Sequence, residues 1–438
     1  MESDETTIGG TQMAAPATTM VTLRVLYEPE RAGARPAMPL GEERFAVGRS
    51  RSHAQLTLQD PRASRRHAIF MATGPERARV EDVSSNGTFV NGERISGSAE
   101  LGDGDLVRVG DSFLLVRVTS THPARDARIT SLTGMHDSMR ALRHTILSVA
   151  PTEAKVLIIG ETGTGKELVA RAIHEHSGRR GRFVAVNCGA IPESLAESQL
   201  FGHVAGAFTG ARSAHEGFMR AADGGTLFLD EIGELSPILQ PKLLRALEDR
   251  TVTPVGSTEA VPIDIRLVAA THRDLLDEVD EGRFRGDLYA RIAGYLVRTV
   301  PLRHRREDIL PLLDESLPEG APPLAPDLVE ALLLHRFRFN VRELKEIVTQ
   351  LAIDGAGAPR LTRAMIAARL EQPEPSEPPV SARRSVPPAE DKRPIPTREE
   401  LEALVAVHGG NVSRIARELR RSRRQIYRYL ERYGLSVG

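Results

Sequence analysis

The sequence predicts a multidomain protein with an N-terminal all-β sandwich, a central α/β domain that carries a helical lid, and a C-terminal all-α domain. Three observations predict this organisation. The 438 residues exceed the roughly 150 that one domain typically uses. Short apolar runs separated by turn residues fill the first quarter of the chain, whereas strand-like and helix-like segments alternate through the middle. A proline-rich stretch then precedes the last helical patterns.

Composition places the chain among ordinary globular proteins, with 27% charged and 40% hydrophobic residues. The formal net charge is -1, so any contact with nucleic acid must come from a local basic patch. The one cysteine, Cys188, excludes an internal disulfide framework and fits a reducing compartment. The polar start MESDETTIGG and the lack of an apolar run of about 18 residues predict a cytoplasmic protein without membrane contact.

The N-terminal domain is expected to span residues 21–118. Its candidate strands share short apolar runs bounded by Gly, Asn or Asp: Val21–Tyr27, Phe45–Val47, Leu56–Leu58, Arg79–Val83 and Phe113–Val118. Many short strands of this kind favour a sandwich of two sheets.

Three motifs in this domain carry groups suited to a phosphate: VGRS, then SRRH at 64–67, then SSNGTFVNG at 84–92. Arg49 offers a guanidinium fork, Ser64 and Arg65 add donors, and the amide of Asn86 can hold a peptide backbone. Taken singly, the Asn-Gly pairs are also ordinary hairpin turns and Arg49 a surface arginine.

The three motifs together resemble forkhead-associated (FHA) domains, which read phosphothreonine. The resemblance implies that Arg49, Ser64, Arg65 and Asn86 bind the phosphothreonine, while Gly48 and His67 shape the loops. The ligand would be a phosphorylated protein or this protein's own phosphorylated segment.

The central domain is expected at residues 129–370, with the helical lid from about 302. The apolar runs VLIIG, FVAVN, TLFLD and RLVAAT alternate with helical segments, which predicts a parallel sheet covered by helices.

A phosphate-binding loop follows the first of these strands. The sequence GETGTGKE supplies Gly160, Glu161, Thr162, Gly163, Thr164, Gly165, Lys166 and Glu167. Glycines let backbone N–H groups turn toward phosphate oxygens, and Lys166 adds a positive charge. The general pattern has Ser or Thr where this chain has Glu167.

The strand TLFLD delivers two carboxylates, Asp230 and Glu231, at its end. Asp230 is the candidate ligand of Mg²⁺, and Glu231 the candidate group that orients or activates the attacking water. Both motifs in this order predict binding of ATP, against the alternative of a glycine-rich turn and a solvated acidic pair.

The central domain resembles the AAA+ domain of sigma-54-dependent transcription activators. Most specific is ESQLFGHVAGAFTGA, which contains the loop that touches sigma-54 in that family: Gly206, Ala207, Phe208, Thr209, Gly210 and Ala211. The flanking glycines permit large changes of φ and ψ at an exposed tip.

The resemblance also implies roles for four further residues. Asn187 would be the switch residue that senses Glu231, Arg342 the lid arginine at the nucleotide, and Arg285 and Arg291 the arginine fingers that reach a neighbouring subunit. A homo-oligomer, from dimer to hexamer, follows from such fingers. A solvated basic face is the other interpretation of Arg285 and Arg291.

The chain departs from the family pattern at two places. His272 stands where asparagine is usual, and FRFNVREL at 337–344 replaces a Pro-Gly turn. The first departure puts gamma-phosphate sensing in question, and the second puts the lid geometry in question.

Residues 371–396 are predicted to be a proline-rich linker, and residues 397–438 resemble a Fis-type helix-turn-helix. From Arg414 to Arg432, eight arginines stand against two glutamates, which gives a local formal charge of +6. The candidate DNA-binding residues are Ser422, Arg423, Arg424, Gln425 and Arg428. Ile415, Ala416, Leu419, Ile426 and Leu430 are expected to form the core of this domain.

Together these patterns predict a transcription activator that binds upstream DNA and uses ATP and Mg²⁺ to remodel the sigma-54 RNA polymerase closed complex under phosphothreonine control. The main alternative is a phospho-dependent, DNA-bound scaffold with weak or lost ATPase. A third hypothesis, a remodeller of another client, is opposed by the loop at 206–211.

Overall fold

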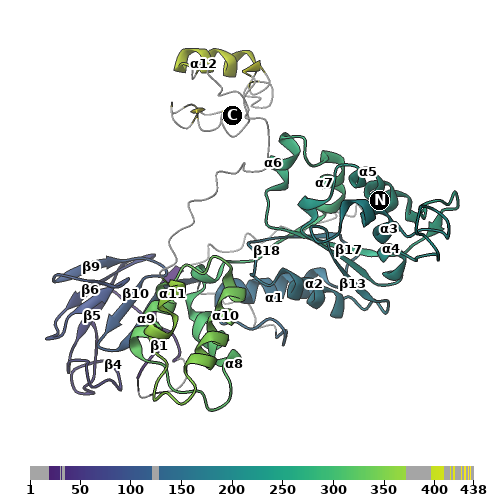
Figure 1. Cartoon of the computed structure of the whole chain (residues 1–438). Coiled ribbons are helices and arrows are strands. Elements are labelled where there is room, and N and C mark those ends of the chain that lie inside the picture. The colour runs from purple at the N-terminus through teal and green to yellow at the C-terminus, as the bar shows by residue number, and fades with distance from the viewer. Residues whose placement is uncertain are drawn as a thin grey trace, which may run out of the picture. The chain divides into compact units, whose positions relative to one another are not determined.

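The computed structural model of the protein describes residues 19–29, 31, 35–120, 128–370 and 396–408, together with isolated positions between 415 and 435. Eleven strands of the described part form the N-terminal domain (Figure 1). They are β1 (Thr19–Tyr27), β2 (Met38–Pro39), β3 (Phe45–Gly48), β4 (Leu56–Thr57), β5 (Ala68–Gly74), β6 (Arg77–Asp82), β7 (Thr88–Val90), β8 (Glu93–Arg94), β9 (Ser98–Leu101), β10 (Leu106–Val109) and β11 (Ser112–Ser120).

These strands build two sheets, which confirms the predicted sandwich. One sheet has the order β2-β1-β11-β10-β7-β8 and the other the order β4-β3-β5-β6-β9. The apolar residues of the two inner faces meet in one buried cluster that includes Leu23, Val47, Phe70 and Val107. The long antiparallel pair of β1 and β11 holds the two ends of the domain side by side.

The central domain contains a five-stranded parallel sheet in the order β13-β14-β17-β12-β18. Its strands are β12 (Val156–Ile159), β13 (Phe183–Asn187), β14 (Thr226–Asp230), β17 (Arg266–Thr271) and β18 (Tyr295–Arg298). The first four are the strands expected from the sequence. The fifth, β18, was not predicted, because only Val297 of its four residues is buried.

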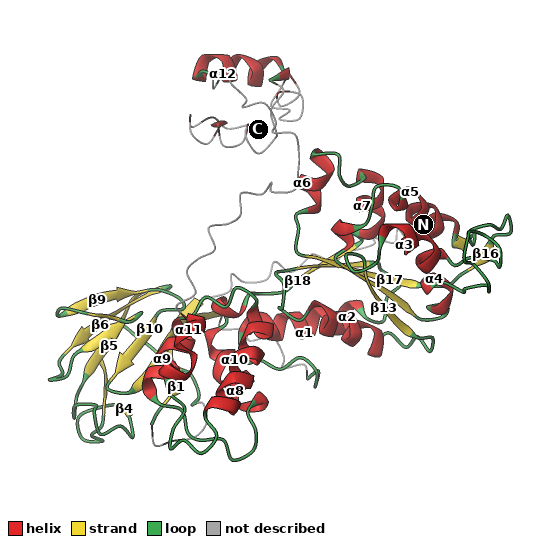
Figure 2. Ribbon diagram, in the orientation of Figure 1, coloured by secondary structure: helices red, strands yellow, loops and turns green. Residues whose placement is uncertain are grey.

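Helices cover both faces of this sheet (Figure 2). They are α1 (Asp137–Val149), α2 (Lys166–Glu175), α3 (Glu193–Phe201), α4 (Phe218–Ala221), α5 (Leu239–Asp249), α6 (Leu275–Asp280) and α7 (Gly286–Ile292). Side chains alternate across each strand, so Val156 and Ile158 pack against α1 and α2, whereas Leu157 packs into the cluster of α3, α5 and α7. A small hairpin, β15 (Thr251–Val252) with β16 (Val261–Pro262), follows α5.

The predicted lid consists of α8 (Ile309–Ser316), α9 (Pro326–Leu334), α10 (Asn340–Asp354) and α11 (Ala367–Leu370). Phe337 lies in the turn before α10 and is fully buried. It takes a positive φ of 47°, a conformation that is costly for a bulky residue, and Asn340 follows with a φ of 52°. The turn without the Pro-Gly pair therefore contains left-handed Phe337, and α10 begins with the second left-handed residue, Asn340.

The N-terminal sandwich packs on the lid. Leu26, Leu106, Phe113 and Leu115 of the sandwich share one buried cluster with the lid residues. Polar contacts border this cluster. The Tyr27 hydroxyl donates to the carbonyl oxygen of Leu324 at 2.9 Å, Arg108 Nη1 lies 3.1 Å from Glu330 Oε2, and Arg306 Nη1 donates to the carbonyl oxygen of Gly104 at 2.8 Å. The two domains therefore share an apolar contact with polar edges.

In the C-terminal segment, α12 (Arg398–Val407) begins with a capping box between Thr397 and Glu400. Leu401, Ile415, Ile426 and Leu430 form a buried cluster, with Leu419 packed against it. The expected core is confirmed for Ile415, Leu419, Ile426 and Leu430, Leu401 joins it, and Ala416 lies outside the described residues.

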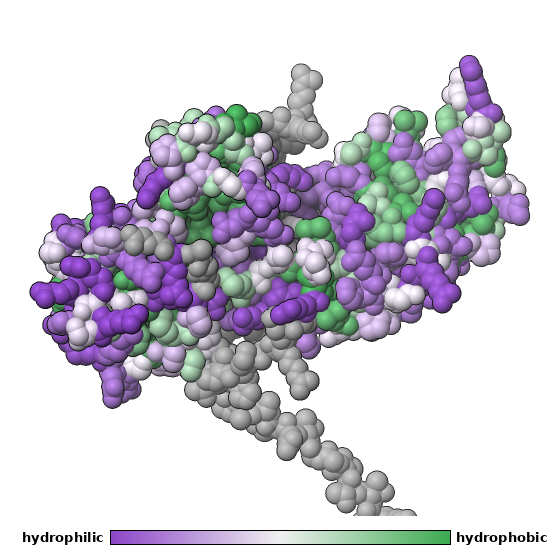
Figure 3. All heavy atoms as spheres, turned by 90° about the horizontal axis from the view of Figure 1, so that it is seen from below, coloured by the Kyte–Doolittle hydropathy of each residue, from purple (hydrophilic) through white to green (hydrophobic). Residues whose placement is uncertain are grey.

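Hydrophilic residues occupy most of the face shown in Figure 3, with smaller hydrophobic areas between them. Across the described residues, every helix is too short or too polar to cross a bilayer.

Candidate nucleotide and phosphopeptide sites

The predicted phosphate-binding loop connects β12 to α2. Gly163 has a φ of 78° and Gly165 a φ of 97°, conformations that glycine adopts without steric cost. The loop therefore needs glycine at both positions. Lys166 is the first residue of α2, and its Nζ donates to the carbonyl oxygen of Gly160 at 3.0 Å, which folds the lysine back over the loop. The N-terminus of α2 and the lysine charge thus face the same space, as an anion site requires.

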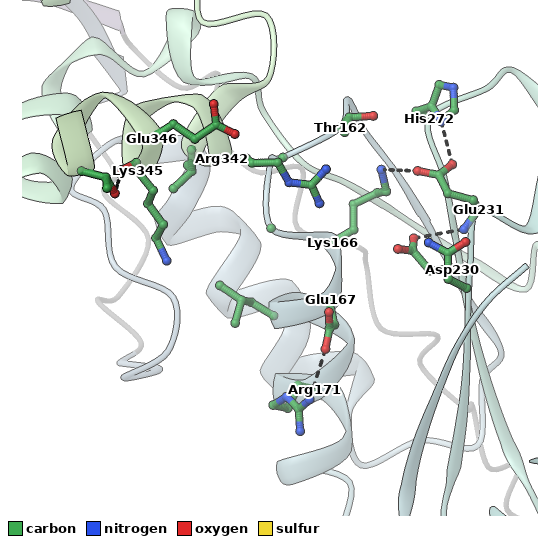
Figure 4. Close-up of a pocket in the computed structure, with 16 residues that line it drawn as sticks. Thr162, Lys166, Glu167, Arg171, Asp230, Glu231, His272, Arg342, Lys345 and Glu346 are labelled. Carbon is green, nitrogen blue, oxygen red and sulfur yellow. Dashed lines mark hydrogen bonds and ion pairs between the residues drawn. The ribbon is translucent and has the colours of Figure 1, made fainter. Parts of the chain in front are cut away.

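Three side chains meet where β14 and β17 end (Figure 4). Glu231 Oε1 lies 3.4 Å from Lys166 Nζ, and Glu231 Oε2 lies 2.6 Å from His272 Nδ1. Neighbouring parallel strands end at the same edge of the sheet, so the residues that follow them converge. Glu231 itself has a left-handed backbone, with φ 51° and ψ 49°.

The two carboxylates of this edge differ in their electrostatics. Burial and the charge of Glu231 raise the pKa of Asp230. Burial also raises the pKa of Glu231, but the hydrogen bond from His272 and the charge of Lys166 outweigh it, so the pKa lies below the ordinary value. Glu231 is therefore held in the ionised form, which a group that orients water needs.

The lid closes the loop from the other side. Asn340 Nδ2 donates to the carbonyl oxygen of Thr162 at 3.0 Å, and Val341 N donates to the carbonyl oxygen of Gly163 at 3.0 Å. A Cβ on Gly163 would lie 2.0 Å from the carbonyl oxygen of Phe339, so the close approach requires glycine there as well.

A pocket of about 910 Å³ lies between the loop and the lid (Figure 4). The predicted site residues among those that line it are Thr162, Gly163, Gly165, Lys166, Glu167, Asn187, Asp230, Glu231 and Arg342. His272 and Lys345 line it as well. The structure thus brings most of the predicted nucleotide-binding and catalytic residues to one cavity.

Two glutamates of the loop have their own partners. Glu167 Oε1 lies 3.2 Å from Arg171 Nη2, one turn further along α2. Glu161 Oε2 accepts from Arg303 Nη1 at 2.7 Å, and this contact lowers the pKa of Glu161. Arg303 comes from the segment that leads into the lid and was not singled out from the sequence, where it reads as one arginine in a basic run.

Of the remaining family positions, Asn187 lines the pocket, whereas Arg285 and Arg291 do not. Asn187 Oδ1 accepts from the backbone N–H groups of Gly189 at 2.9 Å and Ala190 at 3.2 Å. Arg285 is exposed and pairs with Asp287 at 2.6 Å, while Arg291 Nη2 donates to the carbonyl oxygen of Leu247 at 3.0 Å. Both arginines are absent from the lining of the nucleotide pocket within the described part of the chain.

The predicted sigma-54 loop, residues 206–211, lies between α3 and α4. Gly206 and Gly210 both have positive φ, at 80° and 103°. Phe208 is 41% exposed, and its ring packs at 5.0 Å on the ring of His203. An aromatic residue on a glycine-bounded turn is therefore presented to solvent, as the sequence predicted.

The four predicted phosphothreonine residues lie on loops that contact one another. Arg49 N donates to the carbonyl oxygen of Ser64 at 3.0 Å, and Asn86 Nδ2 donates to the carbonyl oxygen of Arg62 at 2.8 Å. The side chains of Arg49, Arg65 and Asn86 belong to exposed residues. Buried His67 lies beneath them, where Ser64 N donates to Nδ1, so that Nε2 carries the proton and donates to the carbonyl oxygen of Gly87.

The candidate DNA-binding residues Ser422, Arg423, Arg424, Gln425 and Arg428 lie outside the described residues.

The fold and the pocket define a P-loop nucleotide-binding domain with a helical lid. Three family models match the chain: a sigma-54 interaction domain at residues 132–298, an FHA domain at 45–110 and a homeodomain-like domain at 395–436.

Curated relatives extend this match. The transcriptional regulatory protein ZraR of Klebsiella oxytoca is 50% identical over 233 residues, which are 51% of this chain and 52% of that protein. ZraR of Escherichia coli (strain K12) is 41% identical over 321 residues, 71% of this chain and 70% of that protein. The sigma54-dependent transcriptional regulator SfnR of Pseudomonas fluorescens (strain Pf0-1) is 47% identical over 243 residues, 54% of this chain and 66% of that protein. The match thus spans only about half of the length of the first of these relatives.

Among solved structures, NtrX from Brucella abortus in complex with ATP matches with a TM-score of 0.51 and 31% identity, over 71% of each chain. The chain belongs to the sigma-54-dependent transcriptional regulators, and it carries an FHA domain and a C-terminal helix-turn-helix domain.

Proposed function

We propose that this protein hydrolyses ATP and uses the energy to remodel the sigma-54 RNA polymerase closed complex. The observation that carries the proposal is the convergence of Lys166, Asp230 and Glu231 at one edge of the sheet, in the pocket that Arg342 of the lid also lines. Lys166 and the backbone N–H groups of residues 160–166 would hold the phosphates, and Glu231 would orient the attacking water.

The residues present fit a magnesium ion bound together with the nucleotide. Asp230 offers one carboxylate to the pocket, and the described residues contain no group of three or more His, Cys, Asp or Glu that could hold a metal. Mg²⁺ is commonly bound by one or two carboxylates with phosphate oxygens and water. It would neutralise the charge that develops on the phosphates.

Arg285 and Arg291 are proposed as fingers that complete the site of a neighbouring subunit. Support comes from their place outside the pocket of their own subunit, on or beside the short helix α7. The guanidinium group suits the charge of a transferring phosphoryl group. The active form would then be a homo-oligomer, at most a hexamer by family resemblance.

The exposed loop at 206–211 is the proposed contact with sigma-54. Phe208 offers apolar area at the tip, and the two flanking glycines let the loop change conformation without strain. Thr209 lies beside it and is exposed.

The FHA domain is proposed to regulate the ATPase, and the C-terminal domain is proposed to place the protein on DNA. Exposed Arg49, Arg65 and Asn86 would bind a phosphothreonine of another protein or of this chain, together with Ser64. The sandwich packs on the lid through Arg108 and Glu330, which offers a direct route from the phosphothreonine reader to the lid. The basic C-terminal segment would bind upstream DNA in the cytoplasm.

The experiment that tests the proposal is open-complex formation by sigma-54 polymerase on a cognate promoter, with and without ATP and phosphothreonine peptides. We expect ATP-dependent open complexes with the wild type and none with Glu231→Gln. If ATP has no effect under any ligand condition, or if Glu231→Gln leaves promoter output unchanged, the proposal is wrong and the scaffold alternative is favoured. A Thr209→Ala protein that loses ATPase but still binds sigma-54 would contradict the contact assigned to the loop.

A further inference from the structure

The side chain of Glu231 has two partners in the described structure, and they differ in kind. Lys166 approaches Oε1 at 3.4 Å, a long contact for an ion pair, whereas His272 Nδ1 lies 2.6 Å from Oε2. The lysine is also the group that meets the phosphates in a site of this type. When Lys166 contacts the phosphates, the hydrogen bond from His272 is the contact that the Glu231 carboxylate keeps.

The fold fixes the backbone of His272 close to Glu231. It follows directly on β17, whose six residues are all buried, and β17 lies between β12 and β14 in the sheet. Gly160 N at the start of the phosphate-binding loop donates to the carbonyl oxygen of Thr271 at 3.1 Å. His272 is therefore fixed at its backbone to the rigid centre of the sheet, next to both halves of the site.

Glu231 needs such a partner. Its backbone is left-handed, so its side chain leaves the end of β14 in a direction that the regular strand would not give. The side chain is 18% exposed, which leaves space for it to turn. A carboxylate that must orient one water is effective only in a narrow range of positions.

Asn187, the family's switch residue, does not share this contact in the described structure. Its Oδ1 accepts from the N–H groups of Gly189 and Ala190, which fixes it in the turn that follows β13.

We infer that His272 is the positioning residue of Glu231, the carboxylate that Asn187 would sense according to the family resemblance. This inference rests on the proposed ATPase function. His272 stands where the family usually has asparagine, and its imidazole supplies the donor that holds the Glu231 carboxylate.

The test is the steady-state ATPase of the full-length protein with two substitutions of similar shape. In His272→Asn, the amide nitrogen stands on Cγ where Nδ1 stood and can donate to Glu231. In His272→Leu, a methyl group stands there and cannot. We expect His272→Leu to lower kcat about tenfold or more, since a hydrogen bond to a charged group is lost. The KM for ATP should change less than about twofold, because His272 acts on Glu231. His272→Asn should retain most of the wild-type kcat.

A second readout uses the nucleotide-free protein. Thermal unfolding of His272→Leu, Glu231→Gln and the double variant should show non-additive shifts of the midpoint, since the two side chains share one hydrogen bond. His272 is 43% exposed on its side chain, so all variants are expected to fold.

Equal kcat in the Asn and Leu variants, or additive midpoints, would overturn the inference and leave the proposed function intact. A wild-type protein without ATPase would overturn both.

Discussion

Asn340, the first residue of α10, donates its side-chain amide to the carbonyl oxygen of Thr162 in the phosphate-binding loop at 3.0 Å. The same side chain accepts from Leu302 N at 2.8 Å, and the residue is fully buried with a φ of 52°. One side chain thus joins the loop, the start of the lid and the turn before α10.

Substitution of Asn340 by alanine is expected to lower the free energy of unfolding by about 2–4 kcal/mol, since buried groups lose their hydrogen-bond partners and alanine tolerates the left-handed backbone less well than asparagine does. The measurement is the thermal midpoint, together with the Kd of a fluorescent ATP analogue. Asn340→Gly is the matched control, because it removes the same hydrogen bonds without backbone strain and should be the less damaging change. Wild-type behaviour of Asn340→Ala in both measurements would contradict the role of this residue.

Reversal of the pair Arg108 and Glu330 tests the contact of the sandwich with the lid. Their side chains are 26% and 21% exposed, and we expect a coupling of about 1 kcal/mol in a double-mutant cycle of Arg108→Glu and Glu330→Arg. Thermal unfolding of the four proteins gives the coupling. The pair of Arg44 and Glu81, which is 61% and 43% exposed within the sandwich, is the control and should show almost none. Similar coupling in both pairs would argue against a distinct sandwich–lid contact.

The pH dependence of stability should report on His136, the residue before α1. Burial, with the charges of Arg117 and Arg305, lowers its pKa to about 3. In the unfolded chain the value is about 6.5, so between these values the unfolded state binds the additional proton. The contribution of the neutral His136 imidazole to the free energy of unfolding is therefore fully present above about pH 6.5 and is lost as the pH falls toward about 3.

The measurement is the thermal midpoint at about pH 7.5 and about pH 5, above and below the unfolded pKa of histidine. On acidification, the thermal midpoint of the wild type should fall more than that of His136→Asn. The asparagine does not take up a proton, and its amide can still cap α1. His144→Asn, on the exposed side of α1, should follow the wild type. The prediction fails if His136→Asn and the wild type respond equally.

Binding of a phosphothreonine peptide should depend on Arg49. We expect Arg49→Ala to weaken binding by at least about tenfold in fluorescence anisotropy, because a charge-assisted hydrogen bond to phosphate is lost. Arg44→Ala, an exposed arginine just before β3, is the control and should bind as the wild type does. Binding of the unphosphorylated peptide with equal affinity would show that the domain does not read phosphate.

Much of the fold follows from local patterns. The runs VLII, FVAVN, TLFLD and RLVAAT are strands because continuous apolar segments are buried on both faces of a parallel sheet. The strand Tyr295–Arg298 was not predicted. It lies at the edge of the sheet and has one buried residue, so its sequence shows no long continuous apolar run. The turn at Phe337–Phe339 could not be derived either, since its left-handed φ depends on the burial of Phe337 in the lid.

Residue type and short spacing were enough to predict which side chains are suited to chemistry: a lysine after a glycine-rich loop, two carboxylates after a strand, and an arginine, a serine and an asparagine on turns. These are local features, set by residue type and short spacing. The contact of His272 with Glu231, the hydrogen bond from Asn340 to the loop, and the packing of the sandwich on the lid became visible only in the folded chain. Each of these contacts joins segments far apart in the chain, and such pairings arise from the packing of whole elements, which no local pattern encodes.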